Sequence, residues 1–129
     1  MSVTGTFVLS SNENYEAWLQ AAGIPADTAT RLAAAKPTLE VTKGDNTVTV
    51  KTTSGDKVFS NTVTYGQDSE ADIAGLKYFV NAEPTSNGYK GTIKLGSKTG
   101  TISVENNATG FVQTTTIEGV TAKRFYTKQ

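Results

Sequence analysis

Apolar and polar residues alternate along most of the chain after residue 38. Val48 and Val50, for example, are separated by Thr49 and followed by Lys51. Alternation of this kind places apolar side chains on one face of a strand and polar side chains on the other. Turn residues such as Gly, Asn, Asp and Ser interrupt the pattern about every 8–12 residues, a spacing typical of an all-β sandwich or barrel.

Before residue 38 the periodicity is helical. Four large or apolar residues stand three or four positions apart, as on one face of a helix: Tyr15, Trp18, Leu19 and Ala22. Ser11 and Asn12 are expected to cap this helix and Gly23 to end it. A second, alanine-rich helix is expected to begin near Pro25 and to end before Pro37, because proline fits the first turn of a helix but not its interior.

The alternation predicts strand segments at 6–10, 39–42, 48–51, 58–65, 76–82, 89–95, 99–104, 111–117 and 120–127. Asp68, Glu70 and Asp72 are interpreted as turn or surface residues. These are nine placed segments, and a meander of about ten short strands tends to curl and close, since closure removes exposed edges. A barrel wider than about eight strands encloses space. The expected fold is therefore all-β: a ten-stranded antiparallel up-and-down β-barrel, with a helix-turn-helix lid between the first two strands, in a single domain spanning residues 1–129.

Composition excludes several classes of function. The 12 basic and 12 acidic residues leave no net charge, so nucleic acid is not an expected partner. The chain has no His and no Cys, which removes the usual zinc sites and the Ser-His-Asp and Cys-His nucleophiles. We therefore expect no enzyme, no metal and no cofactor. The first residues lack the basic start and apolar run of a signal peptide, which favours a cytoplasmic location.

Four segments, in the right order along the chain, resemble a known family. Residues 5–9 (GTFVL) are similar to an opening G-T-W-x-L motif, and residues 11–19 (SNENYEAWL) to a S-E-N-F-x-x-Y-L helix. Residues 35–40 read AKPTLE, as in the family, and residues 119–126 (GVTAKRFY) are similar to G-V-T-x-x-R-x-Y. The chain thus resembles the intracellular lipid-binding proteins, the fatty-acid-binding and cellular-retinoid-binding group.

The resemblance implies an anchor for the ligand on the last strand. In that family the R-x-Y motif holds the lipid carboxylate inside the barrel, and Arg124 and Tyr126 match the motif here. A spacing of two residues places both side chains on one face of a strand. A guanidinium presents a planar fork of donors that suits a carboxylate, and a phenol adds another donor.

The neighbouring strands depart from the family pattern. The family has a second Arg, or Gln in retinoid carriers, at the position of Val104, which would form an inward apolar pair with Ile102. Gln113 and Thr115 would face inward on the strand between, and Ile93 on the strand before. If the strand of Gln113 is shifted by one residue, that amide faces solvent instead, because a one-residue slip reverses every side chain.

The helices are expected to form the lid and the entrance. The resemblance implies that Tyr15 and Leu19 close over the barrel mouth. It also implies that Leu32, Ala35 and a nearby Val58 make the portal. Trp18 stands where the family has Tyr, and we expect it to be partly exposed.

The resemblance implies a non-enzymatic, monomeric intracellular carrier of a long-chain fatty acid or a similar hydrophobic carboxylate. One alternative keeps the barrel but changes the cargo to a retinoid or another hydrophobic ligand without a carboxylate. The other is a β-sandwich structural or interaction module without a small ligand. Arg31 would support transient membrane contact through the helical lid, although a solvated surface is the simpler interpretation.

Overall fold

The structure, a computed structural model, describes residues 4–55, 57–73 and 76–129. The first half of the chain forms β1 (Gly5–Glu13), α1 (Tyr15–Ala22), α2 (Ala26–Ala34), β2 (Thr38–Lys43), β3 (Thr47–Ser54) and β4 (Lys57–Thr64). The second half forms β5 (Ser69–Ile73), β6 (Leu76–Thr85), β7 (Gly88–Leu95), β8 (Lys98–Asn106), β9 (Gly110–Ile117) and β10 (Val120–Lys128).

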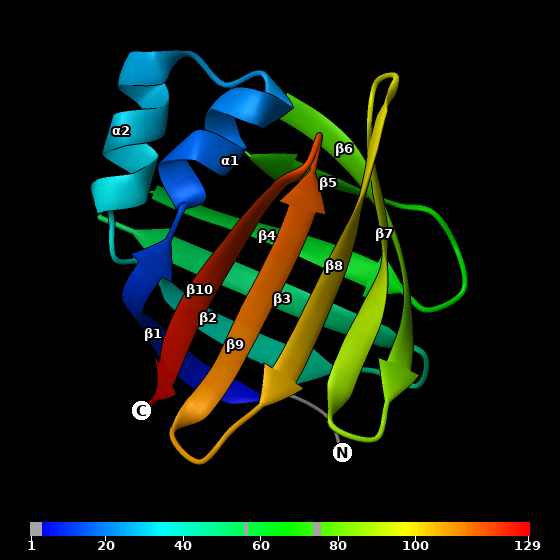
Figure 1. Cartoon of the computed structure of the whole chain (residues 1–129). Helices are drawn as coiled ribbons and strands as arrows, with labels where there is room; N and C mark the ends of the chain where they lie inside the picture. Colours follow the sequence, from blue (N-terminus) through cyan, green and yellow to red (C-terminus); the bar gives the residue numbers. More distant parts are fainter. Residues whose placement is uncertain (1–3, 56, 74–75) are drawn as a thin grey trace.

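One antiparallel ten-stranded sheet contains all the strands, in the order β4-β3-β2-β1-β10-β9-β8-β7-β6-β5. Strands adjacent in sequence are adjacent in the sheet, apart from the pairing of β1 with β10, so the sheet curls into the nearly closed barrel of Figure 1. At the two ends of the sheet, Ser69 Oγ on β5 accepts the N–H of Thr64 on β4 at 2.8 Å. The expected up-and-down barrel is confirmed, and the sandwich alternative is wrong because there is one sheet rather than two.

The helices lie between β1 and β2 and cover one end of the barrel (Figure 1). The expected caps of α1 are wrong, because β1 continues through Ser11 and Asn12, which pair with β10. A register shift between Leu9 and Ser11 allows β1 to follow the curved sheet. The strand-to-helix corner falls instead at Asn14, whose left-handed backbone (φ 61°) is accompanied by a 3.0 Å bond from its Nδ2 to the Thr121 carbonyl.

β5 is the strand that the sequence pattern did not predict. Ser69 and Ala71 are buried while Glu70 between them is exposed, which is the alternation of a strand with one inward face. Ala71 and Asp72 pair with Tyr78 and Lys77 of β6. This pairing decides the conformation, because strand formation depends more on neighbouring strands than on local propensity.

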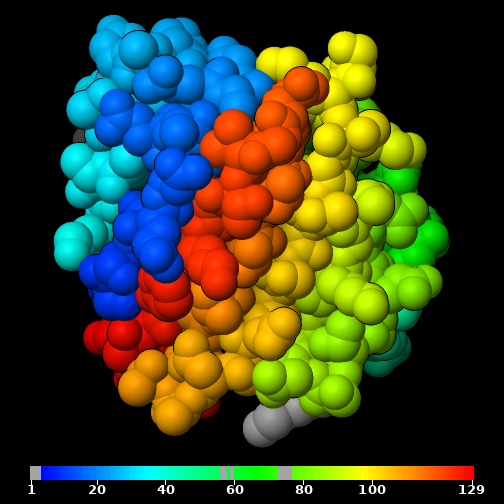
Figure 2. All heavy atoms as spheres, in the orientation of Figure 1, coloured from blue at the N-terminus to red at the C-terminus, as the bar shows by residue number. Residues whose placement is uncertain are grey.

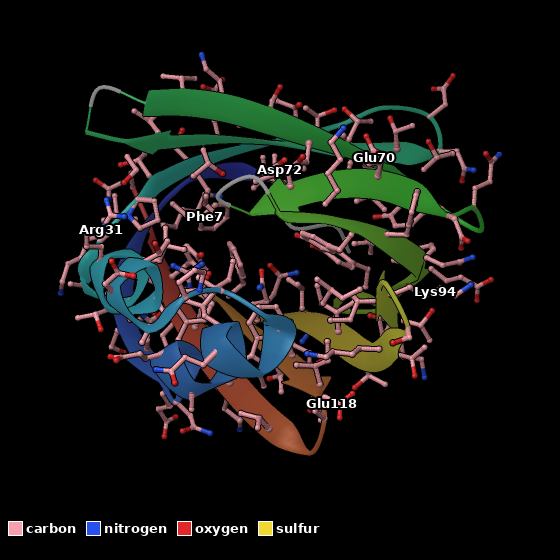
Figure 3. The ribbon with its side chains drawn as sticks, turned by 90° about the horizontal axis from the view of Figure 1, so that it is seen from above. Phe7, Arg31, Glu70, Asp72, Lys94 and Glu118 are labelled. Atoms are coloured by element: carbon pink, nitrogen blue, oxygen red, sulfur yellow. The ribbon has the colours of Figure 1, made fainter. Side chains whose placement is uncertain are left out.

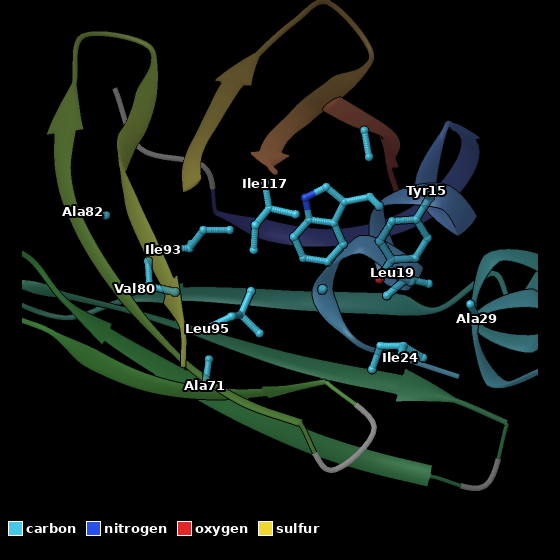
Figure 4. Close-up of a cluster of buried hydrophobic side chains, with 13 residues drawn as sticks. Tyr15, Leu19, Ile24, Ala29, Ala71, Val80, Ala82, Ile93, Leu95 and Ile117 are labelled. Atoms are coloured by element: carbon cyan, nitrogen blue, oxygen red, sulfur yellow. The ribbon is translucent and has the colours of Figure 1, made fainter. Parts of the chain in front are cut away.

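Two clusters of buried hydrophobic side chains stabilise the barrel. The first joins the helices to the upper barrel wall and includes Leu19, Ile24, Ile93, Leu95 and Ile117 (Figure 4). The second packs Phe7, Leu39, Val104, Phe111 and Tyr126 together. On the face shown in Figure 2, the spheres of β1, β10, β9 and β8 form an unbroken wall. Among the described residues, no helix has the length and apolarity needed to cross a bilayer.

Candidate ligand-binding site

A cavity of about 700 Å³ lies inside the barrel. Both helices and strands β2 through β10 contribute residues to its lining. Its apolar wall includes Leu32, Leu39, Val50, Val63, Val80 and Ile93. A space of this size lies within the range of roughly 300–1,000 Å³ typical of small-molecule sites, and an apolar wall with a few polar groups is the usual composition.

Arg124 on β10 contributes a half-buried cation to the lining of this cavity. Its Nε donates a 3.0 Å hydrogen bond to Asn12 Oδ1, and its guanidinium carbon lies 4.0 Å from the centroid of the Tyr15 ring. The ion pairs among the described residues, Lys77–Glu70 and Lys94–Asp68, lie on the outer surface and do not involve Arg124. Arginine carries five N–H donors, so a half-buried guanidinium with one bonded N–H retains donors for an anion.

Tyr126 lies two residues further along β10 and also lines the cavity. Its ring stacks on Phe111, with centroids 4.6 Å apart. Burial raises the pKa of the Tyr126 phenol to about 12, the positive charge of Arg124 opposes this rise, and Tyr15 adds to it. At neutral pH the phenol therefore keeps its proton and can donate a hydrogen bond.

Gln113 faces the cavity beside Arg124. The two residues are direct cross-strand partners, and the same row continues through Val104 to Tyr89. Gln113 and Thr115 both line the cavity, as do Ile102 and Ile93, so the inward register expected for them is present. Val104 occupies the next place in the row but is 1% exposed and packs within the second cluster, outside the cavity surface.

The lid residues divide into two groups. Tyr15, Leu32 and Ala35 line the cavity, whereas Leu19 is fully buried in the packing between α1 and the barrel. Trp18 is only 3% exposed and lines the cavity, so the expectation of partial exposure is wrong. The reason is that the apolar face of α1 turns directly onto the barrel.

Val58 lies outside the cavity lining. Its side chain is 57% exposed, and its partner on β3 is the exposed Thr53. The inward residues of β4 are Asn61 and Val63, which have the opposite parity along the strand. The sheet pleat therefore directs Val58 to the outer surface.

Charged residues also occur at the helical end of the cavity. Arg31 on α2 is exposed, donates a 3.3 Å hydrogen bond to Thr28 Oγ1, and contributes to the lining. Asp72 on β5 contributes as well, and the view onto the helices in Figure 3 shows both residues at this end of the barrel. The interpretation of Asp72 as a turn or surface residue missed this position.

Other lining residues were missed although a signal existed. Asn61 and Tyr78 lie on strands predicted from the sequence, and their alternation with outward neighbours could have identified them. Tyr89 shares its parity with the inward Ile93 on β7. Burial raises the pKa of the phenols of Tyr78 and Tyr89, so both remain protonated donors at neutral pH. No comparable signal marked Asp72, because β5 exists only through its pairing with β6.

A nearly closed antiparallel barrel with a helical cover and an interior cavity defines a protein that encloses small hydrophobic molecules. The chain belongs to the lipocalin / cytosolic fatty-acid binding protein family, whose model matches residues 1–129.

Individual relatives agree with this assignment. The chain is 34% identical to Fatty acid binding protein 1-B.1 of Danio rerio, covering 96% of this chain and 95% of the relative. It is 29% identical to a fatty acid-binding protein of Tyrophagus putrescentiae, covering 100% and 99%. The solved complex of a Schistosoma mansoni fatty acid binding protein with arachidonic acid superposes with a TM-score of 0.89 over 98% and 96% of the two chains. At 24% identity, this likeness supports the fold alone.

Proposed function

We propose that this protein is a non-enzymatic carrier that binds one long-chain fatty acid inside the barrel. The observation that carries the proposal is Arg124, a cavity-facing guanidinium bonded to a neutral amide rather than to a carboxylate of the described chain. The fatty-acid-binding relatives support the same cargo.

In this proposal the carboxylate accepts hydrogen bonds from Arg124 and Tyr126, with the Gln113 amide beside them. The tail lies against the apolar wall, where each buried methylene contributes about 0.8 kcal/mol. The ion pair mainly fixes orientation, because desolvation offsets much of the attraction between buried charges.

Entry takes place at the helical end. α1 is fastened to the barrel by Asn14, which donates to the Thr121 carbonyl, and by Lys98 Nζ, which donates to the Ala21 carbonyl at 2.8 Å. Loosening of α2, which carries Arg31 and Leu32, would open the cavity. We propose that the monomeric carrier works in the cytoplasm, in accord with its cytosolic family, and contacts membranes transiently through this lid.

Replacing Arg124 with Ala tests the carboxylate anchor. We expect the Kd for oleate to rise roughly ten- to a hundredfold, because a charge-assisted hydrogen bond contributes about 1.5–3 kcal/mol. The Kd for the matching alcohol should change far less. Isothermal titration of both ligands measures the difference.

The control is Lys123→Ala, which removes a cation from the outward face of the same strand. Equal losses for acid and alcohol in the Arg124 variant would contradict the anchor.

A second cargo remains a candidate because Val104 is apolar at the position where the family resemblance implies a second Arg or a Gln. A retinoid or another hydrophobic ligand without a carboxylate would suit a row in which Arg124 is the charged residue beside the neutral Gln113, Val104 and Tyr89. Displacement of a bound fluorescent lipid by oleate and by retinol distinguishes the two. Tighter binding of retinol would favour this second cargo.

A further inference from the structure

A second polar group faces the cavity from the opposite side of the barrel. Asn61 on β4 and Thr52 on β3 both contribute to the lining, and both are half-buried. Neither side chain makes a hydrogen bond to another group in the part of the chain that the structure describes. Val50 and Val63, their inward neighbours on the same two strands, are apolar.

The sheet register fixes the direction of Asn61. The next residue, Thr62, is exposed, and its Oγ1 lies 2.9 Å from Thr49 Oγ1 on the outer face. Side chains alternate across a sheet, so Asn61 belongs to the inner face. Its cross-strand partner Val50 also lines the cavity, which confirms the register.

Asn61 and Arg124 stand on different walls. β4 and β3 form one end of the sheet, whereas β9 and β10 lie in its middle. In Figure 1, β3 and β4 cross behind β9 and β10, so the cavity separates the two polar positions. A ligand whose carboxylate lies at Arg124 extends toward Asn61 through the apolar part of the cavity.

A plain hydrocarbon tail is poorly matched to this wall. An amide covered by methylenes loses its water without gaining a hydrogen bond, which is unfavourable. A hydroxyl on the tail avoids this loss, because it can donate to Asn61 Oδ1 and accept from Asn61 Nδ2, with Thr52 Oγ1 beside it.

We propose that the cargo is a long-chain fatty acid bearing a hydroxyl group along its chain, with the hydroxyl bound by Asn61 while Arg124 holds the carboxylate. This inference rests on the proposed fatty-acid-binding function. It adds a polar position for the tail and so narrows the class of ligand.

Titration with octadecanoic acid and a series of its monohydroxylated forms tests the proposal. We expect at least one hydroxy acid to bind roughly three- to tenfold more tightly than the parent, the value of one hydrogen bond. In a purely apolar cavity the hydroxyl would weaken binding. Asn61→Leu should abolish the preference and tighten binding of the parent acid.

The control is Thr62→Val, which alters the adjacent outward residue and should leave the preference intact. Tighter binding of the parent acid than of every hydroxy acid overturns the proposal, and so does a preference that survives in Asn61→Leu. The Arg124→Ala experiment compares oleate with its matching alcohol, and neither ligand has a hydroxyl group along its chain. It therefore tests the proposed fatty-acid-binding function independently of this inference.

Discussion

Arg124 combines three interactions that keep a cation usable inside an apolar barrel. Asn12 accepts one N–H, the Tyr15 ring faces the guanidinium, and the Tyr126 ring lies 5.6 Å from its central carbon. Each interaction supports the positive charge without neutralising it, because amide and aromatic groups carry no net charge. The site thus keeps a cation that a ligand carboxylate can pair with.

The protonated state of Tyr126 can be tested through stability. Burial raises its pKa from the ordinary 10.0 to about 12, so the folded protein binds a proton that the unfolded chain has released in this range. The contribution of Tyr126 to the free energy of unfolding should therefore be fully present below pH 10 and should be lost as the pH rises from 10 to 12.

Urea unfolding of the wild type and of Tyr126→Phe at several pH values measures this dependence. Between pH 10 and 12 the free energy of unfolding of the variant should fall less steeply than that of the wild type. The difference in slope should reach up to about 1.4 kcal/mol per pH unit, the value for one proton. The lysines titrate in both proteins, so their effect on stability cancels in the comparison. Identical slopes in the two proteins would contradict a buried, protonated Tyr126.

At the scale of elements, the extension of β1 beyond Ser10 organises the site. It places Asn12 opposite Arg124 in the β1–β10 register. Asn12 Nδ2 donates to the Ala33 carbonyl of α2 at 3.0 Å, while Asn12 Oδ1 accepts from Arg124. One amide therefore connects the anchor strand to the lid helix.

Asn12→Ala should remove both hydrogen bonds, the one to Arg124 and the one to the Ala33 carbonyl. We expect the dissociation rate of a bound fatty acid to rise roughly three- to tenfold, since one hydrogen bond to a charged group and one to the lid are lost. Stopped-flow transfer of the acid to an acceptor, followed by Trp18 fluorescence, measures the rate.

Ser10→Ala is the matched control, because it removes a different side-chain hydrogen bond of the same strand pair, the 2.9 Å bond from Ser10 Oγ to the Phe125 carbonyl. An equal acceleration by both variants would show that the Asn12 effect is a general loosening of β1.

At the scale of the whole molecule, the cavity exists because the sheet closes around side chains from distant parts of the sequence. The row Arg124, Gln113, Val104 and Tyr89 joins four strands. Two packed clusters, one beneath the helices and one around Phe7 and Phe111, hold the barrel, and residues of both contribute to the cavity surface. The barrel is therefore packed where its clusters lie and hollow between them.

The sequence by itself determined the strands with clear alternation and the two helices, because one segment carries its local periodicity on its own. The barrel was expected from the number of strands together with the family resemblance. The inward direction of Gln113, Thr115 and Ile102 was expected from their places relative to the family's C-terminal motif. The C-terminal Arg124–Tyr126 pair was also recognisable from the local motif.

Only the tertiary structure decided the remaining features. β5 depends on pairing with β6, the burial of Trp18 on how α1 docks, and the outward direction of Val58 on the register of β4 with β3. The same register brings Asn61 to the wall across from Arg124. Such positions are set by contacts between segments far apart in the chain, and no single segment encodes them.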